Sequence, residues 1–496
     1  RASALDGLLD RIHGQDAVAD RYAVLDAGRR DALDAFGRHV VKMRCAAAYD
    51  GAERDDAIVA KHLFDHHEMD VVYAMDEATL FDSFFNYLQQ IDVFALLEHL
   101  DPQKQQRKNI PFFKMTLVFL MKVVGAIKTI DEMNDLLLTD ELLMSMCGFN
   151  AYQVKNGSCQ RGVKLRKTHS PEIRGSLCVD TVANHIVKIG PRRIETFFNR
   201  CIEQLAKQGV FPKIIHAACD STLYETTSKF KGCGCVTRQR KVKARGYRKS
   251  GELKEVSVTL YGWKVWAIYE IKTGIPLAIK IDTIEKPDNL HALAVLEQAK
   301  ENVKISSTID SLVLDRGFLD GKVLYEIDLQ GHEFVIPLKR NMAAASDARQ
   351  LALDCESFTP VTREVEVVHG YGKKKYTEKV HTSLVGVPDL LTCDWFNPEG
   401  SQANTAKKDY EPIPLNAVVV KTWDNKTPPL EKQIVFVTNI GVKDPFITFD
   451  RYDDRSLMEN KLFREVKQNW HFEHPPKKTK LPIIAFFHIC IVYHLS

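Results

Sequence analysis

The sequence lacks a regular cysteine pattern. It has 11 cysteines among 496 residues, without a recurrent spacing, and an odd number argues against a complete set of disulfide bonds. The one cluster is Cys233 and Cys235, with Cys219 nearby. A zinc site needs about four ligands, usually in two pairs, and no second pair follows. The pattern favours buried or loop thiols over a zinc site, and a reducing compartment over an oxidising one.

The sequence also lacks an uninterrupted apolar run of membrane-spanning length, which is about 20 residues. Residues 111–127 are apolar but contain Lys114 and Lys122, and residues 481–495 form a shorter run. Both runs are typical of buried helices, so we expect no membrane association. No signal peptide is visible. The chain begins with Arg1 instead of Met, and one interpretation is that it is a fragment.

Positive charge is scarce in the first fifth of the chain. Residues 1–100 hold 10 Lys/Arg against 19 Asp/Glu, so residues 101–496 carry the whole positive balance of a protein with net charge +3. An acidic helical head is a poor platform for DNA, and we expect it to serve packing or a protein partner. A polyanion would bind the basic remainder.

A chain of this length exceeds one hydrophobic core, and changes in residue pattern divide it into five segments. Residues 1–100 form the acidic helical region, and residues 101–212 continue as helices. Within the latter, residues 153–175 carry six basic side chains against Glu172 alone. This segment is either a DNA-end-binding element or a solvated loop. At Pro212 the pattern changes from helical to strand-like.

Residues 213–340 predict a mixed sheet with helices packed on it. Within residues 214–222 the apolar run ends on Asp220, and within residues 312–318 it ends on Asp315, with Gly317 to turn the chain. Both carboxylates are therefore expected at strand ends. Two strands joined by a turn at residues 272–275 form a predicted hairpin.

Two further features of this segment are predicted. Residues 229–254 hold ten Lys/Arg and one acid, with four glycines, and we expect a mobile basic loop. Residues 320–331 predict a helix with Asp320 as N-cap and Gly331 just after its end.

The last two segments predict an insertion and a return to the core. Residues 341–433 alternate apolar and polar residues, which indicates an antiparallel β-rich insertion. Residues 434–496 supply one more strand and a helix. On that helix Tyr452, Arg455 and Glu459 follow each other at spacings of three and four residues, so their side chains lie on one face.

Three carboxylates, Asp220, Asp315 and Glu459, can be brought together by such a sheet. Two-metal phosphoryl transfer uses hard oxygen ligands to hold two Mg²⁺ ions about 3.5–4 Å apart. Each residue alone has an ordinary alternative, since an Asp at a strand end is often a turn former or a helix cap.

The order and the neighbours of these carboxylates resemble the DDE transposases of bacterial insertion sequences. The resemblance rests on Asp-Ser-Thr at 220–222, Leu-Asp-Arg-Gly-Phe at 314–318 and the Tyr452, Arg455, Glu459 helix, and it covers residues 213–490. The chain is similar to the branch with a Tyr-Arg-Glu-Lys signature. That resemblance implies an RNase H-like catalytic core interrupted by a β-strand insertion before the catalytic glutamate.

The resemblance implies roles for individual residues. Asp220, Asp315 and Glu459 would be catalytic and would bind two Mg²⁺ ions, for which Mn²⁺ is expected to substitute. Tyr452 and Arg455 would contact terminal transposon DNA. The signature lysine departs from the pattern, because Val466 occupies the position seven residues after the glutamate and Lys467 follows it. In a helix Lys467 lies roughly 80° round from Glu459.

The implied partner is double-stranded DNA, as transposon ends and as target, bound by a homodimer. Arg464, Lys241 and Arg245 are further expected DNA contacts, and about half of the basic residues near the site are expected only to solvate the surface. The implied location is cytoplasmic, at the bacterial nucleoid. Two alternatives stay open: a decayed or domesticated transposase that binds DNA without cutting it, and an RNase H-like nuclease without strand transfer.

Overall fold

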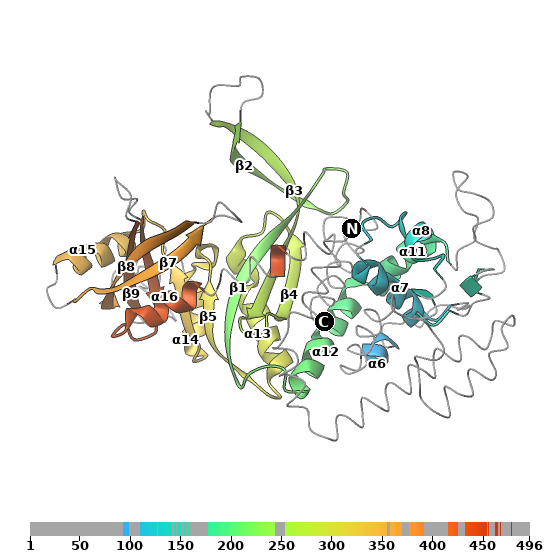
Figure 1. Ribbon diagram of the computed structural model, residues 1–496, viewed down its shortest axis with the longest axis horizontal. Helices are drawn as coiled ribbons and strands as arrows, with labels where there is room; N and C mark the ends of the chain where they lie inside the picture. The colour runs from blue at the N-terminus through green and yellow to red at the C-terminus, as the bar shows by residue number, and fades with distance from the viewer. Residues whose placement is uncertain are drawn as a thin grey trace. The chain divides into compact units, whose positions relative to one another are not determined.

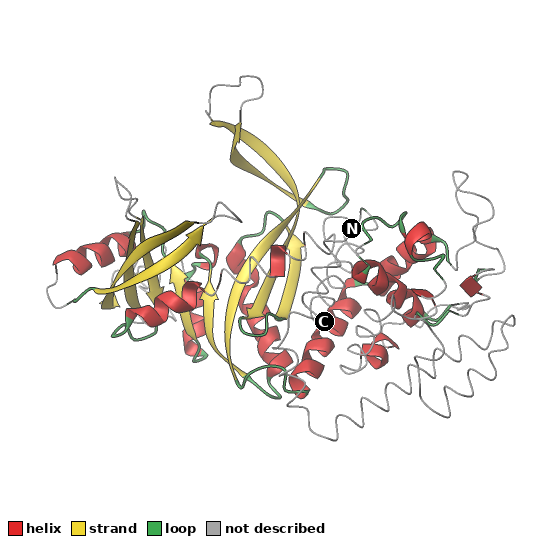
Figure 2. Cartoon of the chain, in the orientation of Figure 1, coloured by secondary structure: helices red, strands yellow, loops and turns green. Residues whose placement is uncertain are grey.

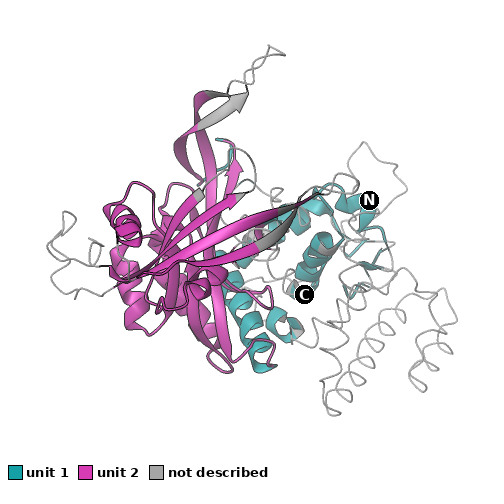
Figure 3. Ribbon diagram, turned by 60° about the vertical axis from the view of Figure 1, so that its left-hand side comes forward, with its two compact units in different colours: residues 1–208, 228–232, 464–496 teal, residues 209–227, 233–463 magenta. Residues whose placement is uncertain are grey.

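The structure is a computed structural model. It describes residues 93–98, most of 110–158, 177–243, 253–354, 358–369, 376–390, 415–424 and 432–453, together with Arg455, residues 462–464, Lys467 and Lys478. The chain divides into two compact units, residues 1–208, 228–232 and 464–496 in one and residues 209–227 and 233–463 in the other (Figure 3). Nearly all of the predicted acidic helical region, most of the basic segment 153–175 and the apolar run 481–495 lie outside the described residues.

The described part of the first unit is helical. Its helices are α6 (Val93–Glu98), α7 (Phe112–Val124), α8 (Met133–Leu136), α11 (Val179–Ile189) and α12 (Pro191–Lys207). Helix α7 confirms the predicted buried helix, because Lys122 is 1% exposed and donates from Nζ to the carbonyl oxygen of Ile127 at 2.6 Å. Helix α12 starts with Pro191, which suits a first helical position, and buries one apolar face. None of the helices in the described ranges is long and apolar enough to cross a membrane.

The second unit is built on one ten-stranded sheet (Figure 2). The strand order is β2-β3-β1-β5-β6-β10-β9-β8-β7, with β4 paired to β3. The strands are β1 (Ile214–Thr226), β2 (Gly234–Lys243), β3 (Leu253–Glu270), β4 (Pro276–Thr283), β5 (Thr308–Leu314), β6 (Glu333–Pro337), β7 (Val361–His369), β8 (Tyr376–Leu390), β9 (Leu415–Asp424) and β10 (Lys432–Thr438).

The first half of this sheet combines antiparallel and parallel pairs. Strand β1 is antiparallel to β3 and parallel to β5, and β5 is parallel to β6. The 3-10 turns η1 (Asp288–His291) and η2 (Arg316–Phe318) and the helices α13 (Ala292–Val303) and α14 (Gly321–Leu329) belong to it. The β3–β4 hairpin is confirmed, as is α14, whose N-cap Asp320 accepts from two backbone N–H groups. This half is thus a mixed sheet with helices packed on it, as the sequence predicted.

Two predictions for this half are wrong. Strand β1 does not end at Asp220, because the antiparallel ladder with β3 continues from the Asp220–Ala267 pair to the Thr226–Tyr261 pair. The expected mobile basic loop contains a strand, since β2 pairs with the first half of β3 from Gly234 to Lys243. The two strands form a ribbon that extends from the sheet (Figure 1).

The second half of the sheet is antiparallel throughout its ladders β10–β9, β9–β8 and β8–β7. It joins the first half through β10, which pairs antiparallel with β6. The predicted β-rich insertion also contains a helix, α15 (Ala343–Asp354), because alanine and leucine favour helix there. Helix α16 (Pro445–Asp453) follows β10 and buries Phe446 against Phe436, Val418 and other core residues of these strands.

Candidate active site

Two predicted carboxylates lie on neighbouring strands. The parallel ladder between β1 and β5 ends with the pair Cys219–Leu314, and Asp220 and Asp315 are the next residues. Side chains alternate between the two faces of a sheet. Both aspartates follow one register pair, and Asp315 has extended backbone dihedrals of φ −77° and ψ 156°. The pattern therefore places both carboxylates on the same face.

The helix after β10 brings Tyr452 and Arg455 to these carboxylates. The Tyr452 ring packs on Phe436 with ring centroids 4.5 Å apart. The Arg455 guanidinium lies 5.5 Å from the centre of the Tyr452 ring. Its Nη1 donates to Asp220 Oδ2 at 2.7 Å, and the two side chains are only 19% and 14% exposed.

The pKa shifts of this group show that its members act on one another. Burial alone would lower the pKa of Arg455, but the charge of Asp220, then Tyr452 and Asp315, raises it overall. Burial raises the pKa of Tyr452, and the charges of Asp315 and Asp220 add to that rise while Arg455 opposes it. Both aspartates therefore contribute to one electrostatic cluster with the arginine and the tyrosine.

The remaining predicted site residues lie on other parts of the chain. Glu459 and Arg245 lie outside the described residues. Lys241 lies in β2, in register with Glu255. Arg464 and Lys467 are helical residues of the first unit.

A turn of π-helix lies between Glu459 and Arg464 in the sequence. Leu462 and Phe463 have π-helical hydrogen bonding and are buried. A π-turn adds one residue to a helix.

A second polar cluster on the opposite face was not predicted from the sequence. Ser221 follows Asp220 on β1, so its side chain points the other way. Its Oγ donates to Asp288 Oδ1 at 2.6 Å, and the buried Lys264 donates to the same oxygen at 3.0 Å. Trp266 Nε1 donates to the Asp288 backbone oxygen at 2.8 Å. The only sequence signal for this second cluster was Ser221 within the Asp-Ser-Thr motif.

The donor set of the first cluster suits a hard divalent cation. Carboxylate oxygens are the ligands that Mg²⁺ prefers, and Asp220 Oδ2 already accepts from a cationic group, Arg455. Within the residues that the structure describes, no group of three His, Cys, Asp or Glu side chains is close enough to hold a metal ion. Asp220 and Asp315 are two of the three predicted ligands, and the third, Glu459, lies outside the described residues. The six described cysteines are free thiols.

Comparisons with known proteins give a family match and, among solved structures, a weak likeness. The piggyBac transposase synaptic complex with hairpin DNA aligns with a TM-score of 0.31 and 10% sequence identity, over 82% of this chain and 75% of that chain. A likeness at that level supports no inference. No curated protein matches the sequence. Residues 212–493, more than half of the chain, match the family described as "Transposase DDE domain", and the chain therefore belongs to this transposase family.

Proposed function

We propose that this transposase cleaves DNA at the ends of its element and joins the freed 3′-hydroxyls to target DNA, by in-line phosphoryl transfers at one metal-dependent site. The observation that supports this most directly is the position of Asp220 and Asp315. They follow one register pair on two parallel strands, with Arg455 bonded to the first. The family membership supplies the reaction class.

Asp220, Asp315 and Glu459 would hold two Mg²⁺ ions, with Mn²⁺ as substitute. When bound, such ions activate the attacking oxygen and stabilise the leaving one. The chain's own contribution is alignment. Arg455 presents a planar fork of donors, which matches a phosphate as well as it matches the Asp220 carboxylate. Tyr452 fixes the position of this arginine by packing between it and Phe436.

Lys467 belongs to the proposed site despite its late position. An uninterrupted helix would place Val466 on the face of Glu459. A π-turn such as the one at Leu462 and Phe463 adds one residue to a helix, and in a helix from Glu459 to Lys467 that addition would offset a one-residue delay in register. The same end of the chain supplies Arg464 as a further DNA contact.

Other parts of the chain receive roles as part of the proposal. Lys241 on β2 and Arg245 after it would contact phosphates, and the basic segment 153–175 in the 101–212 region would recognise element ends. The proposal also includes the five-segment division of the chain, a homodimer across paired ends and membership of the Tyr-Arg-Glu-Lys branch. It further includes a bacterial insertion sequence as the element and action at the nucleoid in the cytoplasm.

The test is Mg²⁺-dependent nicking of a labelled duplex that carries the DNA flanking the gene. Glu459→Gln should bind this duplex as the wild type does and should not nick it. Glu301→Gln is the control, because Glu301 pairs with Lys304 on the surface of α13. Nicking by Glu459→Gln at the wild-type rate would remove Glu459 from the site.

The same assay separates the two alternatives. A decayed transposase would bind the duplex and leave it intact with Mg²⁺ or Mn²⁺. A nuclease of the same fold would give nicks without joined products.

A further inference from the structure

The backbone does not by itself fix the spacing of Asp220 and Asp315. The β1–β5 ladder stops at Cys219–Leu314. Beyond that pair, β1 continues along β3 while the chain after β5 turns into η2. The two carboxylates therefore lie one residue beyond the last ladder pair, where the strands part and a side-chain contact can influence their spacing.

Asp288 contacts both strands at this point, from the opposite face of the sheet. Its Oδ1 accepts from the hydroxyl of Ser221, the residue after Asp220, at 2.6 Å. Its Oδ2 lies so close to Gly317, two residues after Asp315, that a Cβ on this glycine would come within 2.4 Å of the oxygen. The Asp288 carboxylate thus contacts the chain close to both Asp220 and Asp315.

Asp288 is itself held in place. Lys264, 5% exposed at its side chain, donates to Oδ1 at 3.0 Å and also to the carbonyl oxygen of Lys286 at 2.5 Å. Trp266, which is fully buried, donates to the Asp288 backbone oxygen. The next residue, Asn289, donates to Asp320 Oδ2 at 2.8 Å, which ties η1 to the start of α14. The side chain is 31% exposed, yet Ser221 of β1 and Lys264 of β3 both donate to its carboxylate.

We propose that Asp288 is a positioning residue that sets the separation of Asp220 and Asp315, acting through Ser221 on one side and the Gly317 backbone on the other. The inference rests on the proposed function. It predicts that Asp288 variants weaken binding of a divalent cation and slow the chemical step without weakening DNA binding. Groups that orient metal-binding side chains typically contribute 10–100-fold to metal affinity or activity.

Two measurements on the full chain test this. Mn²⁺ is titrated without DNA and the free ion is followed by electron paramagnetic resonance. Nicking of the flanking-DNA duplex is measured for kcat and KM. Asp288→Ala should raise the Mn²⁺ dissociation constant and lower kcat by about 10–100-fold, with KM unchanged. Asp288→Asn keeps an acceptor for Ser221 and loses the charge toward Lys264, so its effect should be smaller.

Two variants reach the same contacts without changing Asp288. Ser221→Ala removes the donor and should reproduce part of the loss, while Ser221→Thr keeps a hydroxyl and should restore it. Combining Ser221→Ala with Asp288→Ala should add little to Asp288→Ala alone, because both remove one contact. Gly317→Ala should displace the carboxylate and weaken Mn²⁺ binding.

The matched control is Asp354→Asn. The Asp354 carboxylate accepts from Gln350 of α15, and this variant should leave Mn²⁺ binding and kcat unchanged. If Asp288→Ala binds Mn²⁺ and turns over as the wild type does, the inference is overturned and the proposed function stands. If Asp288→Ala does not fold, wild-type Mn²⁺ affinity and kcat in both Ser221→Ala and Gly317→Ala have the same meaning. Absence of Mn²⁺ binding and of nicking in the wild type would overturn both.

Discussion

The two halves of the sheet contribute different things to the site. The parallel half, β1, β5 and β6, supplies the two carboxylates Asp220 and Asp315 directly after a register pair. The antiparallel half, β7 to β10, supplies the helix that carries Tyr452 and Arg455. Negative charge thus comes from one half and its cationic partner from the other.

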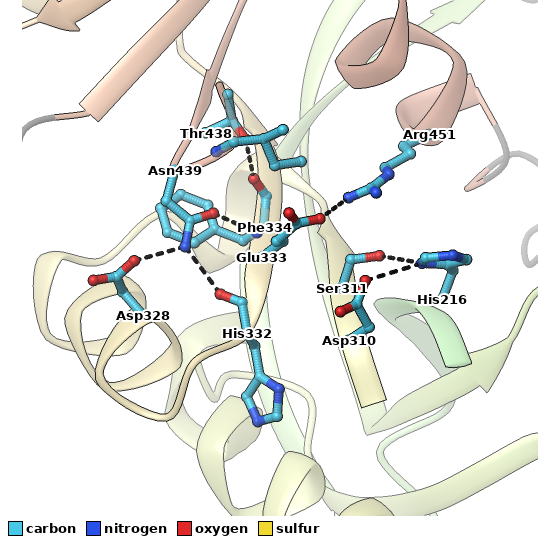
Figure 4. Close-up of polar contacts among 11 residues, drawn as sticks. His216, Asp310, Ser311, Asp328, His332, Glu333, Phe334, Thr438, Asn439 and Arg451 are labelled. Carbon is cyan, nitrogen blue, oxygen red and sulfur yellow. Dashed lines mark hydrogen bonds and ion pairs between the residues drawn. The ribbon is translucent and has the colours of Figure 1, made fainter. Parts of the chain in front are cut away.

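The join between the halves is short. Strand β10 pairs with β6 over three register pairs, Phe436–Pro337 to Thr438–Val335. Side chains reinforce it: Figure 4 shows Asn439 between Asp328, His332 and Phe334. Asn439 donates to Asp328 Oδ1 at 2.6 Å and to the His332 carbonyl at 2.9 Å, and it accepts from Phe334 N at 2.8 Å. These hydrogen bonds form a small polar seam that reinforces the join between the two halves.

The largest effect in this comparison is expected from Arg455. Arg455→Ala removes the cationic partner of Asp220 and should lower the nicking rate about 10²-fold, the usual consequence of losing one aligned charged donor. Arg455→Lys keeps the charge without the planar fork, so its nicking rate should lie between those of the wild type and Arg455→Ala. Single-turnover nicking measures this. The control is Arg349→Ala on α15, and an equal loss in both Ala variants would show that Arg455 acts only through general stability.

An intermediate effect is expected from the seam. Asn439→Ala leaves the Phe334 N–H and the His332 carbonyl without their side-chain partner, and should lower the free energy of unfolding by about 1–3 kcal/mol. Urea unfolding measures this. Gln350→Ala, an exposed residue of α15 that pairs with Asp354, should change stability by less than about 0.5 kcal/mol. If Asn439→Ala and Gln350→Ala have the same free energy of unfolding, Asn439 does not join the two halves.

The smallest effect concerns pH and the interior of the parallel half. His332 is 5% exposed and its Nδ1 donates to the Ile309 carbonyl at 2.8 Å. Burial lowers its pKa from the ordinary value, an effect that the Ile309 bond opposes. As pH falls, the unfolded chain therefore takes up a proton at a higher pH than the folded chain does. The contribution to the free energy of unfolding is fully present above about pH 6.5 and decreases below it.

Urea midpoints at pH 7.5, 6.5 and 5.5 test this prediction. His332→Gln should flatten the decrease below pH 6.5. His216→Gln is the control, since His216 is 35% exposed and contacts Ser311 and Asp310 (Figure 4). An unchanged slope in His332→Gln would assign the pH dependence to other groups.

Local patterns were sufficient for some of these features. The apolar run before Asp315 and the turn at Gly317 predicted a strand that ends at the carboxylate, and β5 does end at Leu314. The capping residue Asp320 fixed the start of α14 in the same way. These predictions succeed because the interactions that decide them lie within a few residues.

Non-local pairing decided the rest. Strand β1 runs past Asp220 because β3 pairs with it there, and the glycines and charges of residues 229–254 concealed a strand that only its partner stabilises. Asp288 meets Ser221 across 67 residues of sequence. Asn439 meets Phe334 across 105. A single sequence carries no local signal for such contacts.

In the proposed site, Asp220 and Asp315 hold the divalent cation that the reaction requires. Asp315→Cys tests it most directly, because a thiolate is a soft ligand that accepts Mn²⁺ far better than Mg²⁺. The account predicts nicking of the flanking-DNA duplex by Asp315→Cys with Mn²⁺ and none with Mg²⁺, while the wild type nicks with both. Wild-type rates for Asp315→Cys in Mg²⁺, or no nicking with either ion, would contradict it.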